Sequence, residues 1–100
     1  DGGAASKVRE TIARVSTNAA TRYTRDLVIA CGDNTHDLTM TPRRPYAPVN
    51  QFYPGNVCMA RMVSAAGEVQ TATATWKGDD DWYFTIAAIR SARSVVQPSR

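Results

Sequence analysis

The chain has 100 residues, of which 43% are apolar, and it carries 12 basic and 9 acidic side chains for a net charge of +3. This length suits a single domain spanning 1–100, and the apolar content excludes an intrinsically disordered chain. The longest apolar stretch, residues 27–31, is too short to cross a membrane, and the scattered arginines argue against a specific nucleic-acid partner.

Residues 4–21 are predicted to form an amphipathic helix. Small apolar side chains recur there at spacings of three and four residues, which places them on one side of a helix: Ala5, Val8, Ile12, Val15 and Ala19. Ser6 can cap the start of this helix. The pattern predicts a helix that lies flat on a sheet, with Ile12 and Val15 buried and with Arg9 and Arg14 exposed.

From residue 22 the apolar period changes to two, which predicts a strand at 22–31 followed by a turn at 32–35 and a short strand at 38–41. Four prolines then fall within 13 residues: Pro42, Pro45, Pro48 and Pro54. Proline lacks the backbone N–H that helices and central strands need. The segment 42–55 is therefore predicted to be an irregular surface loop or edge.

Three further strands are predicted at 56–64, 69–77 and 82–89, joined by short turns into antiparallel hairpins. One turn is the Gly-Asp-Asp-Asp segment 78–81, interpreted as a polar hairpin tip rather than a calcium loop because aromatic residues follow it directly. Even-numbered residues from 70 to 76 and from 82 to 88 are expected to share a face in each strand. The alanines among them leave room for a helix to approach.

The two cysteines, Cys31 and Cys58, permit only one intramolecular pairing. Each lies in an apolar strand beside the proline-rich segment, and their bond would close a loop of about 27 residues, worth roughly 3.5 kcal/mol in the chain-entropy model. This predicts a secreted, periplasmic or cell-surface protein, whose start at Asp1 would then be a processed or trimmed end. The alternative is a cytosolic domain with two unrelated buried thiols.

Together these elements predict an α+β fold: an N-terminal amphipathic helix packed on a four- or five-stranded antiparallel sheet, with one disulfide. The alternative is an all-β sandwich in which the helix is a terminal appendage.

No catalytic residue, metal site or cofactor is predicted. His36 is the only histidine, so an acid–base histidine pair is excluded, and it is interpreted as a solvated turn residue rather than as a weak metal or proton-relay site with Asp33 and Asp37. The chain also contains neither a Gly-x-Ser-x-Gly motif nor a glycine-rich phosphate loop.

The remaining candidate is a binding site in the proline-stiffened segment 42–55. Arginine and aromatic side chains are enriched in interface hot spots, and a stiff backbone loses less entropy on binding. The residues are Arg43, Arg44, Tyr46, Phe52 and Tyr53. The alternative is that the aromatic residues fold back as a lid over one end of the core.

The sequence thus favours a non-enzymatic secreted or cell-envelope domain that binds another protein through the 42–55 segment or through an exposed strand edge. A second possibility is the soluble head of a pilin-like or other self-assembling surface subunit that lacks its hydrophobic helix. A third is a small secreted basic toxin or nuclease.

Overall fold

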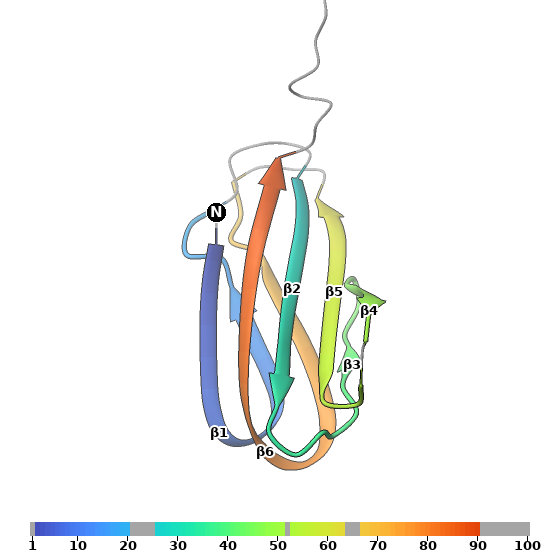
Figure 1. Ribbon diagram of the computed structural model, residues 1–100. Helices are drawn as coiled ribbons and strands as arrows, with labels where there is room; N and C mark the ends of the chain where they lie inside the picture. The colour runs from blue at the N-terminus through green and yellow to red at the C-terminus, as the bar shows by residue number, and fades with distance from the viewer. Residues whose placement is uncertain (1, 21–25, 52, 64–66, 91–100) are drawn as a thin grey trace, which may run out of the picture.

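The computed structural model describes residues 2–20, 26–51, 53–63 and 67–90 (Figure 1). These ranges contain strands and connecting segments and no helix. The strands pair antiparallel and follow one another along the chain as β1 (Gly2–Ser16), β2 (Asp26–Asn34), β3 (Thr41–Pro42), β4 (Ala47–Asn50), β5 (Asn56–Val63) and β6 (Thr71–Arg90). The predicted α+β fold is therefore wrong, and the protein is all-β.

The predicted N-terminal helix is the main error, because residues 2–16 form the strand β1. Nearly its whole length pairs with β6, from Gly2 opposite Ala87 to Ser16 opposite Thr71. This long-range ladder supplies the hydrogen bonds that a helix would have made locally, so tertiary pairing overrides the local pattern. Of the supposed helical stripe, Val15 is buried, whereas Ile12 is only half-buried and Val8 is exposed. Arg9 and Arg14 are exposed as predicted.

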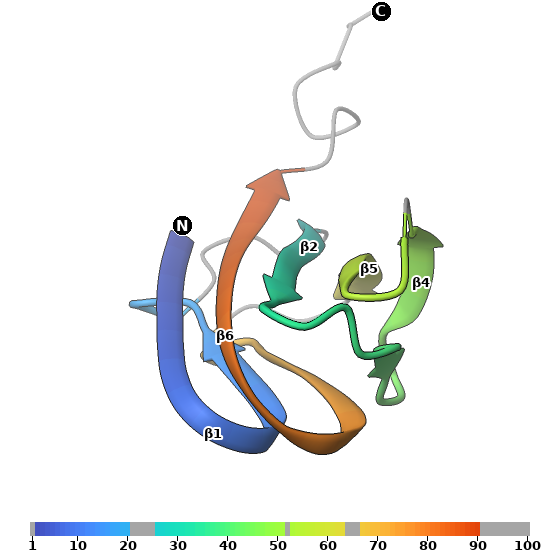
Figure 2. The same ribbon diagram turned by 60° about the horizontal axis from the view of Figure 1, so that its bottom comes forward.

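The single sheet folds into two layers because β1 and β6 each bend (Figures 1 and 2). The first layer has the order β1-β6-β2-β5-β4 and uses the N-terminal half of β1 with the C-terminal half of β6. In the second layer the other halves of β1 and β6 pair with each other, and β3 pairs with β6. The architecture resembles the all-β sandwich alternative, without its helix.

The bend of β6 occupies the segment that was predicted to be a hairpin tip. Gly78 has a φ of 96°, a conformation that suits glycine and few other residues. Residues before the bend pair with the second half of β1, as Ala74 does with Ala13, and residues after it pair with the first half. The two predicted strands, 69–77 and 82–89, are thus one strand that passes from layer two to layer one.

The core lies between the layers, and the predicted alternation within β6 is confirmed. Gln70, Ala72, Ala74 and Trp76 are buried before the bend, as are Trp82, Phe84 and Ile86 after it. Layer two presents Ala72 and Ala74 inward together with the larger Trp76, and layer one presents Trp82, Phe84 and Ile86. The rings of Trp82 and Phe84 meet edge to face, with centroids 5.9 Å apart.

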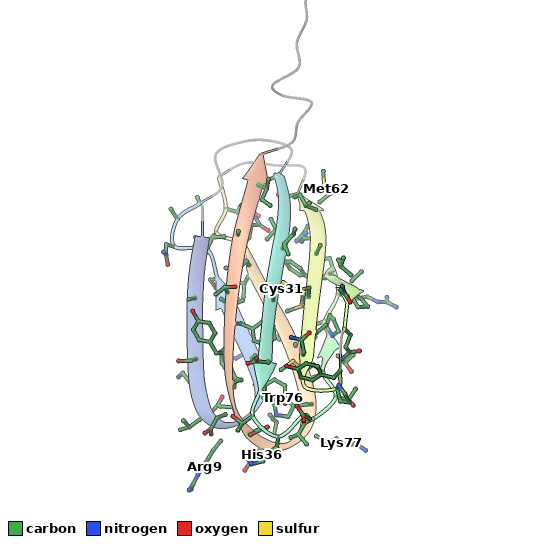
Figure 3. All side chains as sticks on the ribbon, viewed as in Figure 1. Arg9, Cys31, His36, Met62, Trp76 and Lys77 are labelled. Atoms are coloured by element: carbon green, nitrogen blue, oxygen red, sulfur yellow. A yellow bond between two sulfur atoms is a disulfide. The ribbon has the colours of Figure 1, made fainter. Side chains whose placement is uncertain are left out.

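The predicted disulfide between Cys31 and Cys58 is confirmed. The two residues are directly opposite each other in the ladder of β2 and β5, with their Cα atoms 4.1 Å apart. Figure 3 shows Cys31 in the middle of the first layer. In the part of the chain that the structure describes, there is no helix long and apolar enough to cross a membrane.

Candidate functional site

The segment 42–55, predicted to be one irregular loop, divides between the two layers. β3 pairs with β6 in layer two, and β4 pairs with β5 in layer one. A turn joins them, in which the Tyr46 N–H donates to the carbonyl of Arg43 at 3.0 Å. The segment is therefore a crossover between layers, and its residues do not all face the same way.

The four predicted binding residues that the structure describes do not form one surface. Arg43 and Arg44 are exposed, and Tyr53 is half-exposed in the turn before β5. Tyr46 is only 4% exposed and packs in the core, which fits the lid alternative for this residue. Its ring lies 5.9 Å from the Arg61 guanidinium, and burial raises the pKa of its hydroxyl. Phe52 lies outside the described residues.

The exposed strand edges that were predicted as docking sites are protected in different ways. Pro48 lies in the edge strand β4, and Pro42 lies in β3, so both strands lack a backbone donor. The edge strand β1 carries charged side chains and two register shifts near Arg9, which has a φ of 55°. Such bulges and charges disfavour strand addition.

The outer face of layer one is apolar and open to solvent. Its side chains fall in rows across adjacent strands. The first row joins Ile89, Leu27 and Met62, and the second joins Ala87, Ile29 and Ala60. We call this surface the apolar face and define it by ten outward residues: Leu27, Ile29, Cys31, Ala47, Cys58, Ala60, Met62, Thr85, Ala87 and Ile89. None of these side chains is charged.

The apolar face is not the normal exterior of an antiparallel sheet, where polar residues usually alternate with buried apolar ones. Met62 is 53% exposed and Ile89 is 49% exposed, and Leu27 between them is half-buried. Figure 3 places Met62 at the upper end of this layer. The flanking row contains Tyr83, Asp33 and Asn56, so the first charge appears only at the border.

The outer face of layer two has the opposite chemistry. Thr71, Thr73 and Thr75 point outward from β6, because the residues between them are buried. Residues of β1 and β3 flank them, and arginines are among these neighbours. The molecule thus presents one apolar face and one face of hydroxyls and cations, separated by the core.

His36 and Asp80 form a clamp at the lower end of the molecule in Figure 3, where the 34–38 turn meets the bend of β6. The buried Asp80 carboxylate accepts hydrogen bonds from the His36 backbone N–H at 2.7 Å and from the Asp81 N–H at 2.9 Å. His36 Nδ1 lies 2.8 Å from the same carboxylate, while its ring remains largely exposed. The histidine is therefore held by Asp80, which the interpretation as a solvated turn residue missed.

The clamp predicts how stability depends on pH. The hydrogen bond and charge of Asp80 raise the pKa of His36 above 6.5. Burial by itself would raise the pKa of Asp80, but the hydrogen bonds donated by His36 and Asp81 outweigh it and hold that pKa below 3.8. The folded state therefore binds the His36 proton more tightly than the unfolded state, so this contribution is complete below pH 6.5 and is lost as the pH rises through the raised pKa. The contribution of Asp80 is lost as the pH falls below 3.8.

We expect the melting temperature of the native chain to fall modestly between pH 6 and pH 8, because the exposed ring is well screened by water. His36→Ala should flatten this slope, since no other histidine is present. Thermal melts of both proteins at four pH values in this window check the expectation. Equal slopes in the two proteins would show that the contact is too weak in solution to matter.

Within the described ranges, no group of three or more His, Cys, Asp or Glu side chains is placed to hold a metal ion. Comparison of the chain with protein-family models, with curated proteins and with solved structures gives no match. The function is therefore inferred from the chemistry of the two outer faces.

Sequence reasoning missed both faces for the same reason. Alternation in β6 already separated Tyr83, Thr85, Ala87 and Ile89 from the buried set. The predicted N-terminal helix, however, would cover one side of the sheet. The strand register decides which residues are neighbours across the sheet and which side of the sheet another element covers. The sequence alone does not show this register.

Proposed function

We propose that this protein is a non-enzymatic subunit of an exported assembly and that it associates with a second copy of itself through the apolar face. The proposal rests on one observation, the continuous run of uncharged side chains across β6, β2, β5 and β4. A pilin-like subunit is not proposed, because that hypothesis required an N-terminal helix where the chain forms β1. A self-assembling subunit does not require the helix.

A second copy is the favoured partner because the face is electrically neutral. The chain as a whole carries a net charge of +3, so two copies repel each other on average as they approach. The apolar face contains no charged side chain and therefore adds no like-charge repulsion when two copies meet there. Its neutral side chains also give a charged partner no opposite charge to attract it.

The arrangement of side-chain sizes also favours pairing with itself. The row of Ile89, Leu27 and Met62 forms a ridge, and the adjacent row sets Ala87 and Ala60 on both sides of Ile29. In a two-fold arrangement, the ridge of one copy can lie over the alanines of the other. Two such sheets would pack face to face about 10 Å apart, as the layers of β-sandwiches do.

The apolar face is large enough to form the centre of such a contact. Four strands about 4.8 Å apart and five residues rising about 3.4 Å each, as from Leu27 to Cys31, make a face about 19 Å wide and about 17 Å long. Its flat area is on the order of 330 Å², and the accessible area of the protruding side chains is larger. Specific interfaces bury about 800 Å² on each partner, so the apolar face forms the core of the proposed contact and the polar residues around it form its rim.

Export to an oxidising compartment is part of the proposal. A disulfide links Cys31 and Cys58, and such bonds persist outside the reducing cytosol. Because this disulfide lies on the half-buried outer side of the sheet rather than in the core, a cytosolic reductant would reach it easily.

The proposal predicts a concentration-dependent dimer that charge at the apolar face disrupts. Met62→Lys should raise the dimer dissociation constant at least about tenfold, because the interface would bury an unpaired ammonium group. Sedimentation velocity over a wide range of protein concentrations measures this constant.

Val69→Lys is the matched control, because Val69 is 52% exposed, as Met62 is 53% exposed, but lies outside the apolar face. Both variants add the same charge, so a general effect of charge on association would appear in both. A native protein that stays monomeric at every concentration, or equal effects of the two lysines, would refute the proposed dimer.

A further inference from the structure

The outer face of layer two brings together residues from three distant parts of the chain. In the ladder, Thr73 of β6 lies opposite Arg14 of β1, and on its other side its carbonyl accepts a hydrogen bond from the Arg43 N–H at 2.8 Å. We call this surface the threonine face and define it by eight outward residues: Ile12, Arg14, Ser16, Thr41, Arg43, Thr71, Thr73 and Thr75.

We propose that the threonine face binds an acidic polysaccharide, a glycan chain that carries carboxylate or sulfate groups. This inference concerns a different surface from the proposed dimer and holds for a monomer as well as for an assembly. Its three components are a pair of arginines, a row of hydroxyls and a groove.

Two arginines flank a position at which an anion can bind. Arg14 and Arg43 flank Thr73 from the two neighbouring strands, so their Cα atoms lie about 9.6 Å apart, two strand spacings. Both are exposed, and the one ion pair among the described residues joins His36 and Asp80 instead. Guanidinium groups at this spacing can donate paired hydrogen bonds to an oxyanion between them.

The hydroxyls provide the groups that recognise sugar. Threonines at every second residue of β6 stand about 6.8 Å apart along one line. Thr41 lies beside Thr75, and the Ser16 and Thr71 hydroxyls are hydrogen-bonded to each other at 2.7 Å. Each hydroxyl is both a donor and an acceptor, as are the hydroxyl groups of a glycan.

A groove continues this surface toward the bend of β6. It has a volume of about 510 Å³ and is lined by Leu38, Thr39, Thr41, Thr75, Trp76 and Lys77. Small-molecule sites commonly measure about 300–1,000 Å³, so one or two sugar rings fit. Lys77, which Figure 3 shows projecting from the lower end of the molecule, adds a third cation near the groove.

The scarcity of exposed rings favours a glycan over a nucleic acid. None of the eight residues of the threonine face is aromatic, and Trp76, which lines the groove, is only 7% exposed, so unpaired bases would find little ring surface on which to stack. No acidic residue is among the eight, so none of them repels an anion, and the nearest one along β1, Glu10, lies opposite Asp80 beyond the row of Ile12. The surface is thus suited to anionic groups linked by hydroxyl-bearing rings.

The experiment measures binding by calorimetry at low and moderate salt with four probes: dextran sulfate, oligogalacturonate, uncharged dextran and a single-stranded oligothymidylate. We expect one or both acidic glycans to bind and to weaken as salt rises, and uncharged dextran to bind far more weakly. Sulfate or carboxylate specificity follows from which acidic glycan binds more tightly. Binding of oligothymidylate as tight as that of the better glycan would overturn the proposal, and so would no binding of either acidic glycan.

Substitutions test whether the acidic glycan binds at the threonine face. The double variant Arg14→Ala and Arg43→Ala should weaken glycan binding at least about tenfold, whereas Lys7→Ala with Arg9→Asn removes the same charge outside the threonine face and should have little effect. Asparagine is chosen because Arg9 has a positive φ, which asparagine tolerates. Thr73→Val, which keeps the shape and the charge, should also weaken binding. Equal losses in the two double variants would show general charge attraction and refute the site.

Discussion

Replacing Cys31 and Cys58 together by alanine should lower the free energy of unfolding by about 3.5 kcal/mol. The bond closes a loop with a sequence separation of 27 residues, which contains the crossover with β3 and β4. Neither short strand pairs with more than one other strand, so the order of this segment depends on its two ends being held together. Without the bond, the unfolded chain gains the entropy of an open loop.

The folded structure should survive this change, because eight residue pairs join β2 and β5 independently of the sulfur atoms. Urea unfolding of the native chain and of the double variant measures the difference. Thr85→Ala removes a side chain that neighbours Cys31 on the same face and should change stability by no more than about 0.5 kcal/mol. A double variant within about 1 kcal/mol of the native protein would mean that the ladder alone orders the loop.

The strands that the sequence predicted well are those whose alternation is regular and whose inward side chains are large. Trp82, Phe84 and Ile86 mark one face of the last strand so clearly that no other secondary structure fits. The disulfide was predictable for a different reason, since two cysteines permit a single pairing.

β1 was not predictable, because its apolar spacing satisfies a helix by coincidence. Val15 points into the core while Val8 and Ile12 point outward, so the residues of the predicted helical stripe do not lie on one side of β1. Register shifts between Lys7 and Glu10 and between Glu10 and Ile12 interrupt the alternation that would have indicated a strand. The correct structure depends on β6, which lies some 70 residues away in the sequence.

The bend of β6 is a second feature that the sequence alone could not predict. Glycine followed by three aspartates is typical of a hairpin tip, and it is equally suited to a bend within one strand. What distinguishes the two is the partner: β1 follows both halves of β6 through the bend. The same missing register concealed the row of Arg14, Thr73 and Arg43, whose residues lie at least 29 positions apart.

Phe84→Ala should lower the free energy of unfolding by about 3–5 kcal/mol. The Phe84 side chain is 0% exposed and meets the Trp82 ring at 5.9 Å. Its ring also covers the backbone at Gly32, its partner on β2. Small alanines line part of the opposite layer, so the surrounding side chains fill the resulting cavity only in part.

Three further variants test whether the loss at Phe84 comes from its packing or from a general sensitivity of β6 to substitution. Tyr83→Ala removes a neighbouring ring that is half-exposed and should cost about 1 kcal/mol or less. Gly32→Ala tests the same contact from the other side: a methyl group there would overlap the Phe84 ring and the Tyr83 carbonyl, so a loss of about 1–3 kcal/mol is expected. Gly2→Ala, whose methyl group would meet only ordinary contacts, should be neutral or slightly stabilising. Equal tolerance of alanine at both glycines, measured by urea unfolding, would show that Phe84 does not pack against β2 in solution.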